Sequence, residues 1–399
     1  MLTLPLAEPY LARAPKVAFI GSYPPRECGI ATFTKDVVSS FGALTTTPHW
    51  VVAIDERPDL VRSYPSEVVA RIVRDRPETY VLAADAIASL APDVVHIQHE
   101  YGLFGGEDGE RIFDLLDRLH APLVLSLHTV LPDPSDHHRL TARRLCARAD
   151  AVVVLSEAGK KILASDYGVE RRKLRVIPHG VPDVPFESTD AAKRDLGFGG
   201  RTLISTFGLI NRGKGLEYAI DALRAVVPRH PEIVYLILGE THPEVRRSEG
   251  EVYRESLKER IRSYGLERHV RLIDRYLGFD ELIGYLRATD IYLTPYVNPV
   301  QIVSGTLAYA VGCGKAIVST PYLYAKELLA DQRGLLAAFR DGDSIATQLL
   351  GLLDVPGLRR TISQRAYDFG RSMTWSHVSL QHLKLFRELA PMRLAKRTA

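Results

Sequence analysis

A glycine-rich, cationic loop lies in the middle of the chain. Residues Gly208–Leu216 read GLINRGKGL and follow a predicted strand at Thr202–Phe207. Glycines let a ligand approach the backbone closely, and the ammonium group of Lys214 can bind a diphosphate. The amide groups at the start of the next helix would face the same space. The pattern is equally typical of a plain turn with two solvated cations, Arg212 and Lys214.

A second phosphate-binding candidate is the segment Ser304-Gly305-Thr306-Leu307, which follows a predicted strand ending at Thr294. Ser304 can cap a helix, Gly305 leaves room for an anion, and the first free amides point outward. Taken alone, this pattern is more often an ordinary helix cap. Two such loops in one half of the chain favour anion binding.

A third candidate lies near the N-terminus, where SYPPRECGIATFTKDVV follows a predicted strand at Val17–Gly21. Gly29 stands at the entry to a probable helix, and we interpret it as a point of contact with phosphate groups. A structural turn is the alternative. The segment has no GxGxxG fingerprint, which argues against a dinucleotide-binding domain.

His128 ends a short, mostly apolar strand in PLVLSLHTV. A histidine at the carboxyl end of a strand can donate to a hydroxyl group or carry a proton. The alternative is a core histidine with a satisfied hydrogen bond. Its position at the strand end favours the functional interpretation.

Another polar cluster follows the predicted strand Asp93–Gln98, where the chain continues as HEYGLFGGEDG. His99, Glu100 and Tyr101 at this strand end suit the binding of a carbohydrate, although a surface loop of mixed polarity fits equally well. Asp136, in PDPSD, either contacts the same ligand or starts a helix. The segment lacks the HExxH pattern and no ligand triad is nearby, so we predict no metal site.

Short apolar runs alternate with amphipathic segments along the whole chain, which predicts an α/β fold with doubly wound parallel sheets. The predicted strands of the first half are Val17–Gly21, Trp50–Ile54, Asp93–Gln98, Pro122–His128, Ala151–Leu155 and Leu174–Pro178. Helices are expected between them, for example at Gly109–Leu119 and Leu140–Ala149.

The polar, proline-bearing segment Gly180–Asp195 interrupts this rhythm and is typical of an interdomain linker. The strand pattern then restarts with Thr202–Phe207, Val234–Leu238, Val270–Ile273, Ile291–Thr294, Ala316–Ser319 and Leu335–Ala338. We therefore predict two Rossmann-like domains, 1–185 and 186–371, with the amphipathic segment 372–399 rejoining the first. Ligands of such sheets bind beyond the carboxyl ends of the strands, so the two domains are expected to face a cleft.

Composition excludes several classes of protein. The 399 residues carry a net charge of +3, too nearly neutral for a nucleic-acid binder. No apolar run reaches the ~20 residues that span a bilayer, and the N-terminus lacks the features of a signal peptide. The three scattered cysteines fit a reducing cytoplasm. Peripheral contact with the inner face of the membrane stays open, because a local basic face can exist in a neutral chain.

Taken together, these motifs resemble the family-four retaining glycosyltransferases of the GT-B architecture, over nearly the whole length. The combination of HEYGLFGGEDG, SGTLAYA and STPYLYAKELL is similar to a bacterial, mannosyltransferase-like subgroup. The matching segments are GIATFT (Gly29–Thr34), DVVHIQ (Asp93–Gln98), LHT (Leu127–Thr129), VVVLSE (Val152–Glu157), VIPHGV (Val176–Val181), FGL…KGLE (Phe207–Glu217), CGKAIVST (Cys313–Thr320) and TW (Thr374–Trp375).

The resemblance implies that a nucleotide sugar binds the C-terminal domain and that the acceptor binds mainly the N-terminal domain. Lys214 would hold the diphosphate with Ser304, Gly305, Thr306 and Leu307, while Gly29 would touch it. His128 would contact the donor sugar. His99, Glu100, Tyr101 and Asp136 are the expected acceptor-side or sugar-side residues.

The chain departs from the family pattern at three positions. The family carries two glutamates eight positions apart before the CG turn, and here those positions hold Gln301 and Tyr309. Gln301 can still hydrogen-bond a sugar, but Tyr309 cannot grip a ribose diol as a carboxylate does. Glu327 lies near the position of another acidic residue of the family and could partly replace that contact. Leu209 stands where the family has an arginine, and Arg212 of the same loop could substitute.

The resulting expectation is a retaining transfer of mannose or glucose from GDP-mannose or UDP-glucose to a carbohydrate or glycolipid, without a metal or other cofactor. His128, Lys214 and Gln301 are the predicted catalytic residues. A phosphorylase that uses inorganic phosphate, a less favoured epimerase, and a non-catalytic sugar or nucleotide binder are the alternatives.

Overall fold

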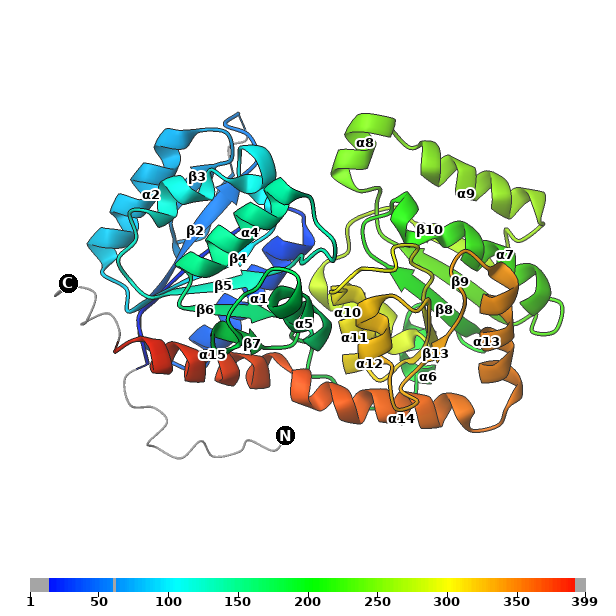
Figure 1. The fold of residues 1–399 in the computed structure, drawn as a ribbon. Helices are drawn as coiled ribbons and strands as arrows, with labels where there is room; N and C mark the ends of the chain where they lie inside the picture. Colours follow the sequence, from blue (N-terminus) through cyan, green and yellow to red (C-terminus); the bar gives the residue numbers. More distant parts are fainter. Residues whose placement is uncertain (1–13, 60–61, 392–399) are drawn as a thin grey trace. The chain divides into compact units, whose positions relative to one another are not determined.

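The computed structural model describes residues 14–59 and 62–391, and the chain forms two compact units. The first unit runs to Gly180 and takes up the chain again at Trp375, while Val181–Thr374 form the second. Figure 1 shows both units as layered α/β structures, each with its own sheet.

The sheet of the first unit has seven parallel strands in the order β3-β2-β1-β4-β5-β6-β7. Its central strands are buried along their whole length, as expected where helices cover both faces of a parallel sheet, although β4 carries the polar residues His96, Gln98 and His99. The strands are β1 (Val17–Gly21), β2 (His49–Asp55), β3 (Val68–Val73), β4 (Val94–His99), β5 (Leu123–Leu127), β6 (Ala151–Val154) and β7 (Leu174–Val176).

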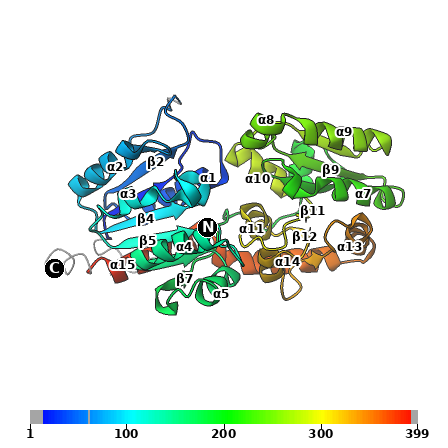
Figure 2. The ribbon, with the colours of Figure 1, turned by 45° about the horizontal axis from the view of Figure 1, so that its top comes forward.

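Helices of the first unit separate these strands, and the last one comes from the C-terminal end of the chain. Helix α15 packs along α1, so the returning segment belongs to the first unit (Figures 1 and 2). The helices are α1 (Gly29–Gly42), α2 (Pro77–Leu90), α3 (Ile112–Leu116), α4 (Asp136–Arg148), α5 (Glu157–Ser165) and α15 (Trp375–Leu389).

The sheet of the second unit has six parallel strands in the order β10-β9-β8-β11-β12-β13. Its strands are β8 (Thr202–Phe207), β9 (Ile233–Leu238), β10 (Val270–Ile273), β11 (Ile291–Thr294), β12 (Ala316–Ser319) and β13 (Leu335–Leu336). Its helices are α6 (Asp190–Asp195), α7 (Leu216–Val226), α8 (Pro243–Glu249), α9 (Val252–Ser263), α10 (Phe279–Ala288), α11 (Gly305–Gly312), α12 (Leu323–Leu328), α13 (Gly342–Asp354) and α14 (Leu358–Gly370).

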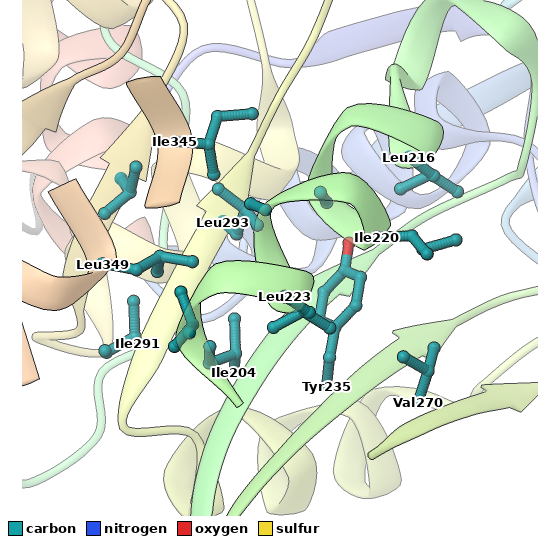
Figure 3. Close-up of a cluster of buried hydrophobic side chains, with 14 of the residues drawn as sticks. Ile204, Leu216, Ile220, Leu223, Tyr235, Val270, Ile291, Leu293, Ile345 and Leu349 are labelled. Atoms are coloured by element: carbon teal, nitrogen blue, oxygen red, sulfur yellow. The ribbon is translucent and has the colours of Figure 1, made fainter. Parts of the chain in front are cut away.

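The core of the second unit shows why its helices lie on the sheet as they do. Apolar residues of α7 recur at helical spacing, and Leu216, Ile220 and Leu223 all face the strands. They belong to one buried cluster with Ile204 of β8, Tyr235, Ile291, Leu293, Ile345 and Leu349 (Figure 3). This packing holds the start of α7 beside the end of β8.

In both sheets the strand order reverses at one point, between β1 and β4 in the first and between β8 and β11 in the second. Loops that follow such neighbouring strands diverge to opposite faces and leave room for a ligand. In the first unit these loops begin at Ser22 and Glu100, and in the second they begin at Gly208 and Pro295.

Several predicted elements need correction. The sequence interpretation missed β3, an edge strand whose Arg71 interrupts the apolar pattern to pair with Asp55. The helix predicted at Gly109–Leu119 forms only over Ile112–Leu116, because short 3-10 segments with a left-handed residue at Asp108 precede it. The predicted linker Gly180–Asp195 belongs to the second unit from Val181 onward and ends in a helix. Within the described residues, no helix combines the length and the apolar character needed to cross a bilayer.

Candidate active site

Tyr296 connects the two predicted phosphate-binding segments of the second unit, the loop that contains Lys214 and the start of α11. Lys214 Nζ donates to Tyr296 Oη at 2.5 Å, and the ammonium group also lies 4.2 Å from the centre of the tyrosine ring. Tyr296 lies two residues after the end of β11, while Lys214 lies two residues before the start of α7. A cation held over an aromatic face and by its hydroxyl has few alternative positions, so Lys214 is fixed before any ligand arrives.

The same tyrosine reaches the start of α11. Tyr296 Oη lies 2.7 Å from Thr306 Oγ1, which in turn lies 3.1 Å from Ser304 Oγ. Ser304 accepts a hydrogen bond from the amide of Leu307 at 3.3 Å and thereby caps the helix. One chain of hydroxyl groups therefore connects the lysine with the helix N-terminus.

Two glycines let these loops approach each other closely. A Cβ atom on Gly208 would lie 3.2 Å from Lys214 Nζ and 3.3 Å from Thr306 Cγ2, which shows that the three residues are neighbours. A Cβ atom on Gly215 would lie 2.2 Å from the carbonyl oxygen of Pro295. Both glycines also have positive φ, so the glycine-rich pattern is required by backbone conformation and by space.

The electrostatics of the site formed by Lys214, Tyr296 and the start of α11 favour an anion. It contains the ammonium group of Lys214 and the positive end of α11, where the amides of Gly305 and Thr306 begin the helix. Of the predicted phosphate-binding residues, the structure brings together Lys214, Ser304, Thr306 and the amide-bearing start of α11.

Arg212 does not join this group. It is exposed, pairs with Glu249 at 3.4 Å and lies over the ring of Tyr253. Gln301 lies in the loop before α11, where its side-chain amide donates to the carbonyl of Val303 at 2.8 Å. Its remaining oxygen leaves an acceptor for a ligand hydroxyl.

Tyr309 and Glu327 lie on helices of the second unit. Tyr309 is only 6% exposed and packs in an apolar cluster beside Phe207, with the ring centres 6.3 Å apart. Glu327 lies on α12, partly exposed, and its carbonyl accepts from Arg333. Tyr309 thus presents little surface to a nucleotide, while Glu327 keeps part of its side chain accessible.

In the first unit, His128 is anchored to the neighbouring strand. His128 Nε2 lies 2.9 Å from Gln98 Oε1, at the end of β4. Burial, followed by the nearby His179 and His99, lowers the pKa of His128 to about 3. The ring is therefore neutral near pH 7 and suited to hydrogen bonding.

An aromatic cluster surrounds His128 on its other side. Phe33 of α1 meets His128, His179 and Trp375 edge to face, with centroid distances of 4.8, 4.9 and 5.3 Å. His179 donates from Nδ1 to the carbonyl of Gly180 at 2.7 Å, and burial lowers its pKa to about 4. These contacts fix the plane of the His128 ring.

The cluster after β4 is more buried than a surface loop would be. His99 is fully buried and stacks on Phe104, and burial lowers its pKa to about 3. Glu100 accepts from the hydroxyl of Thr129 at 2.6 Å and from the amide of Tyr101 at 3.0 Å, while burial raises its pKa. His99 is therefore inaccessible to a ligand as it stands, whereas Glu100 and Tyr101 are partly exposed.

Asp136 and Gly29 both lie at helix starts. Asp136 is the exposed first residue of α4, and Ser135 caps that helix by accepting from the amide of His138. Gly29 is the exposed first residue of α1, with no atom within 4 Å of a Cβ built on it. The backbone near Gly29 is accordingly open to a ligand. Within the described ranges, no group of three histidine, cysteine or acidic residues could hold a metal ion.

Sequence comparisons assign this architecture to a family. A model described as Glycosyltransferase Family 4 matches residues 29–183, and one described as Glycosyl transferases group 1 matches residues 201–355. The chain belongs to the family-four glycosyltransferases. The resemblance to this family, inferred from the sequence motifs, is thereby confirmed.

Known members of this glycosyltransferase group are distant in sequence. Mannosylfructose-phosphate synthase of Agrobacterium fabrum is 26% identical over 47% of this chain and 45% of its own length. Phosphatidyl-myo-inositol mannosyltransferase of Mycolicibacterium smegmatis is 25% identical over 54% of this chain and 52% of its own. The chain spans about half the length of these curated relatives. D-inositol 3-phosphate glycosyltransferase of Kineococcus radiotolerans is 24% identical over 80% of this chain and 78% of its own.

Solved structures establish the fold of this glycosyltransferase. HepE of Anabaena, in complex with UDP, superposes with a TM-score of 0.74 at 16% identity and covers 94% of this chain and 100% of that one. Sucrose-phosphate synthase of Thermosynechococcus elongatus gives 0.74 at 16% identity, with 94% and 99% covered. The fold is GT-B, as predicted.

The sequence analysis missed Tyr296 and the contact that Gln98 makes, although both organise the candidate site. Tyr296 was not singled out, although it lies only two residues after the end of β11. Gln98 belongs to the polar group at its strand end that suits a carbohydrate, but its contact with His128 was not predicted. Their partners are far away in the sequence, so only the sheet order brings them together.

Proposed function

We propose that this protein is a retaining hexosyltransferase that moves mannose or glucose from a nucleotide sugar, GDP-mannose or UDP-glucose, to a carbohydrate or glycolipid acceptor. The observation that carries the proposal is the assembly of Lys214, Tyr296 and Thr306 at the start of α11. It offers a positive charge and free amides to one anion.

Glycosyl transfer needs such a site. As the bond to the sugar breaks, negative charge develops on the leaving diphosphate, and donors that are already in place stabilise it without reorganisation. Lys214 supplies the charge, and the amides of Gly305 and Thr306 supply hydrogen bonds. In this proposal the chemical step needs no metal, since these groups carry the neutralisation.

The residues near the sugar are assigned from both domains. We assign Gln301 and the neutral ring of His128 to hydroxyl groups of the hexose, and the exposed backbone at Gly29 to the diphosphate. Glu100, Tyr101 and Asp136 are assigned to the acceptor side, and Glu327 to the nucleotide side. The relatives support a hexose as the transferred sugar, since a phosphatidyl-myo-inositol mannosyltransferase and a D-inositol 3-phosphate glycosyltransferase are among them.

A ligand screen followed by product analysis tests the proposal. A ligand at about 100 times its dissociation constant adds about 2.7 kcal/mol to stability, which a thermal shift detects. We expect GDP-mannose or UDP-glucose to stabilise the wild type, and a Lys214→Ala variant to lose most of that shift. NMR of the anomeric proton should show an unchanged configuration in the product. No shift with any nucleotide sugar, or an inverted product, would overturn the assignment.

One observation favours a second candidate, a sugar phosphorylase. The buried Tyr309 provides no carboxylate for a ribose, while the anion site of Lys214 would serve inorganic phosphate equally well. Release of sugar 1-phosphate from an oligosaccharide, without any nucleotide, would establish this activity.

A further inference from the structure

A line of buried polar side chains leads from the sheet of the first unit to His128. Ser126 Oγ lies 2.7 Å from His96 Nε2, which lies 3.2 Å from Gln98 Nε2, and Gln98 Oε1 lies 2.9 Å from His128 Nε2. Ser126, His96 and Gln98 are at most 1% exposed. Residues 96 and 98 share one face of β4 because side chains alternate along a strand.

The two ends of the Gln98 amide determine which atoms carry hydrogen. Its NH2 group can only donate and faces His96 Nε2, so that nitrogen accepts, and the Ser126 hydroxyl beside it must donate to it as well. Its oxygen faces His128 Nε2, so that nitrogen must donate. A neutral imidazole carries one hydrogen only, which leaves Nδ1 of His128 with a lone pair.

We propose that Gln98 is a positioning residue that holds His128 in the Nε2–H tautomer, so that Nδ1 accepts a hydrogen bond from a hydroxyl group of the bound sugar. The contact with sugar rests on the proposed function, whereas the tautomer does not. His128 then acts as an acceptor and does not transfer a proton, which narrows the role expected from the sequence. A donor sugar lacking that hydroxyl would leave the acceptor unpaired and would be a poorer substrate.

The neutral state of the ring supports this role. Burial lowers the pKa of His128 to about 3, with smaller contributions from His179 and His99. His96 is also held neutral, since burial and the nearby His382 and His128 lower its pKa well below the usual value. The neighbouring His99, His179 and His382 are also neutral near pH 7, because burial lowers the pKa of each. The hydrogen-bond pattern of Gln98 therefore selects the tautomer of His128.

Nitrogen NMR of the full chain with 15N-labelled histidine side chains tests the tautomer directly. The His128 signals are assigned by their absence in His128→Gln. We expect the wild type to show the directly bonded hydrogen on Nε2 and a non-protonated Nδ1. Gln98→Met, which keeps the length but removes both polar groups, should show a mixture of the two tautomers. The matched control Gln381→Met, on the exposed side of α15, should leave the His128 signals unchanged.

Hydrogen on Nδ1 in the wild type would overturn the proposal, as would an unchanged tautomer in Gln98→Met. Both results are independent of turnover. A mixed tautomer in Gln98→Met, together with no activity on any nucleotide sugar, would instead reject the proposed function and leave the role of Gln98 standing.

Kinetics provide a second measurement that holds if Gln98→Met fails to fold. In Gln98→Glu the carboxylate still accepts from His128 Nε2–H, so the tautomer is retained, but the negative charge raises the pKa of His128. We expect kcat/KM within about threefold of the wild type at pH 8.5 and at least tenfold lower at pH 6, because the protonated ring cannot accept. A pH profile identical to that of the wild type would contradict the role of Gln98.

Discussion

The two domains place opposite chemistries at equivalent points of similar sheets. Where β8 and β11 diverge, the second domain holds an ammonium group, three hydroxyl-bearing side chains and a helix start. Where β1 and β4 diverge, the first domain holds two neutral imidazoles, the buried His96 and the half-buried His128, linked through the amide of Gln98. The sheet topology determines where in each domain a ligand can bind, and the side chains determine which chemical group of the ligand binds there.

The difference follows from burial. Lys214 remains partly exposed and keeps its charge available for a ligand, held by an aromatic ring. His96 and His99 are fully buried and His128 is half-buried among strands and aromatic rings, and this loss of contact with water favours the uncharged form of each ring. One domain is therefore suited to an anion and the other to hydroxyl groups.

The largest expected difference between the domains is their response to acid. Burial lowers the pKa of five histidines of the first domain, to about 3 for His99 and His128, to about 4 for His179 and His382, and well below the usual value for His96. Below pH 6.5 the unfolded state binds protons that the folded state does not, so stability falls as the pH decreases. Each histidine should add about one proton to the pH dependence of unfolding between pH 6.5 and its folded pKa.

Tryptophan fluorescence during denaturation measures this loss in the first domain alone, because Trp50 and Trp375 both belong to it. His382→Phe removes one titrating group and should lower the pH dependence of unfolding by about one proton. A pH dependence unchanged by that substitution would contradict the effect assigned to the buried histidines.

The next largest effect concerns the cation of the second domain. Lys214→Ala should reduce transition-state stabilisation by ~2–4 kcal/mol, a fall in kcat of about 30- to 1,000-fold, comparable to the loss of an oxyanion donor. Lys258→Ala, at a partly exposed position of α9 where the lysine pairs with Glu255, is the matched control and should keep the rate. Near-wild-type turnover in Lys214→Ala would remove the assigned role.

Substitutions at two glycines of the first domain distinguish an effect on packing from an effect on activity. A Cβ atom on Gly180 would lie 2.1 Å from the ring of Trp375, so Gly180→Ala should destabilise by about 1–3 kcal/mol through overpacking. Gly29→Ala meets no atom within 4 Å and should change stability by less than ~0.5 kcal/mol while it lowers kcat/KM. Denaturation midpoints and initial rates distinguish the two. Full activity in Gly29→Ala would exclude close contact of that backbone with the donor.

The smallest effect is predicted for the hydroxyl group that holds Lys214. Tyr296→Phe keeps the ring beneath the ammonium and its stacking on Tyr322, but loses the hydrogen bonds to Lys214 and Thr306. A cost of about 1 kcal/mol should lower kcat about fivefold. Tyr264→Phe, which keeps a cation over its ring in the same way, should have no effect. Equal rates in both variants would show that the ring alone positions Lys214.

The sequence predicted every strand of the two sheets except β3. Buried runs such as Val17–Gly21 and Thr202–Phe207 were found to the residue, because strands that are buried on both faces are rich in apolar side chains. Val68–Val73 was missed because the charged Arg71 interrupts its apolar pattern. The other edge strands, β7, β10 and β13, were predicted, so an edge position by itself does not hide a strand.

The sequence by itself determined the family, the GT-B fold, the place of His128 at a strand end and those of Lys214 and Ser304 in loops between a strand and a helix, because these depend on apolar periodicity and on short motifs. Only the tertiary structure decided which side chains hold these residues. Tyr296 meets Lys214 across 82 positions and Gln98 meets His128 across 30, since parallel strands adjacent in a sheet are separated by whole helices in the chain. Such pairs leave no local signal, and only the order of the strands brings them into contact.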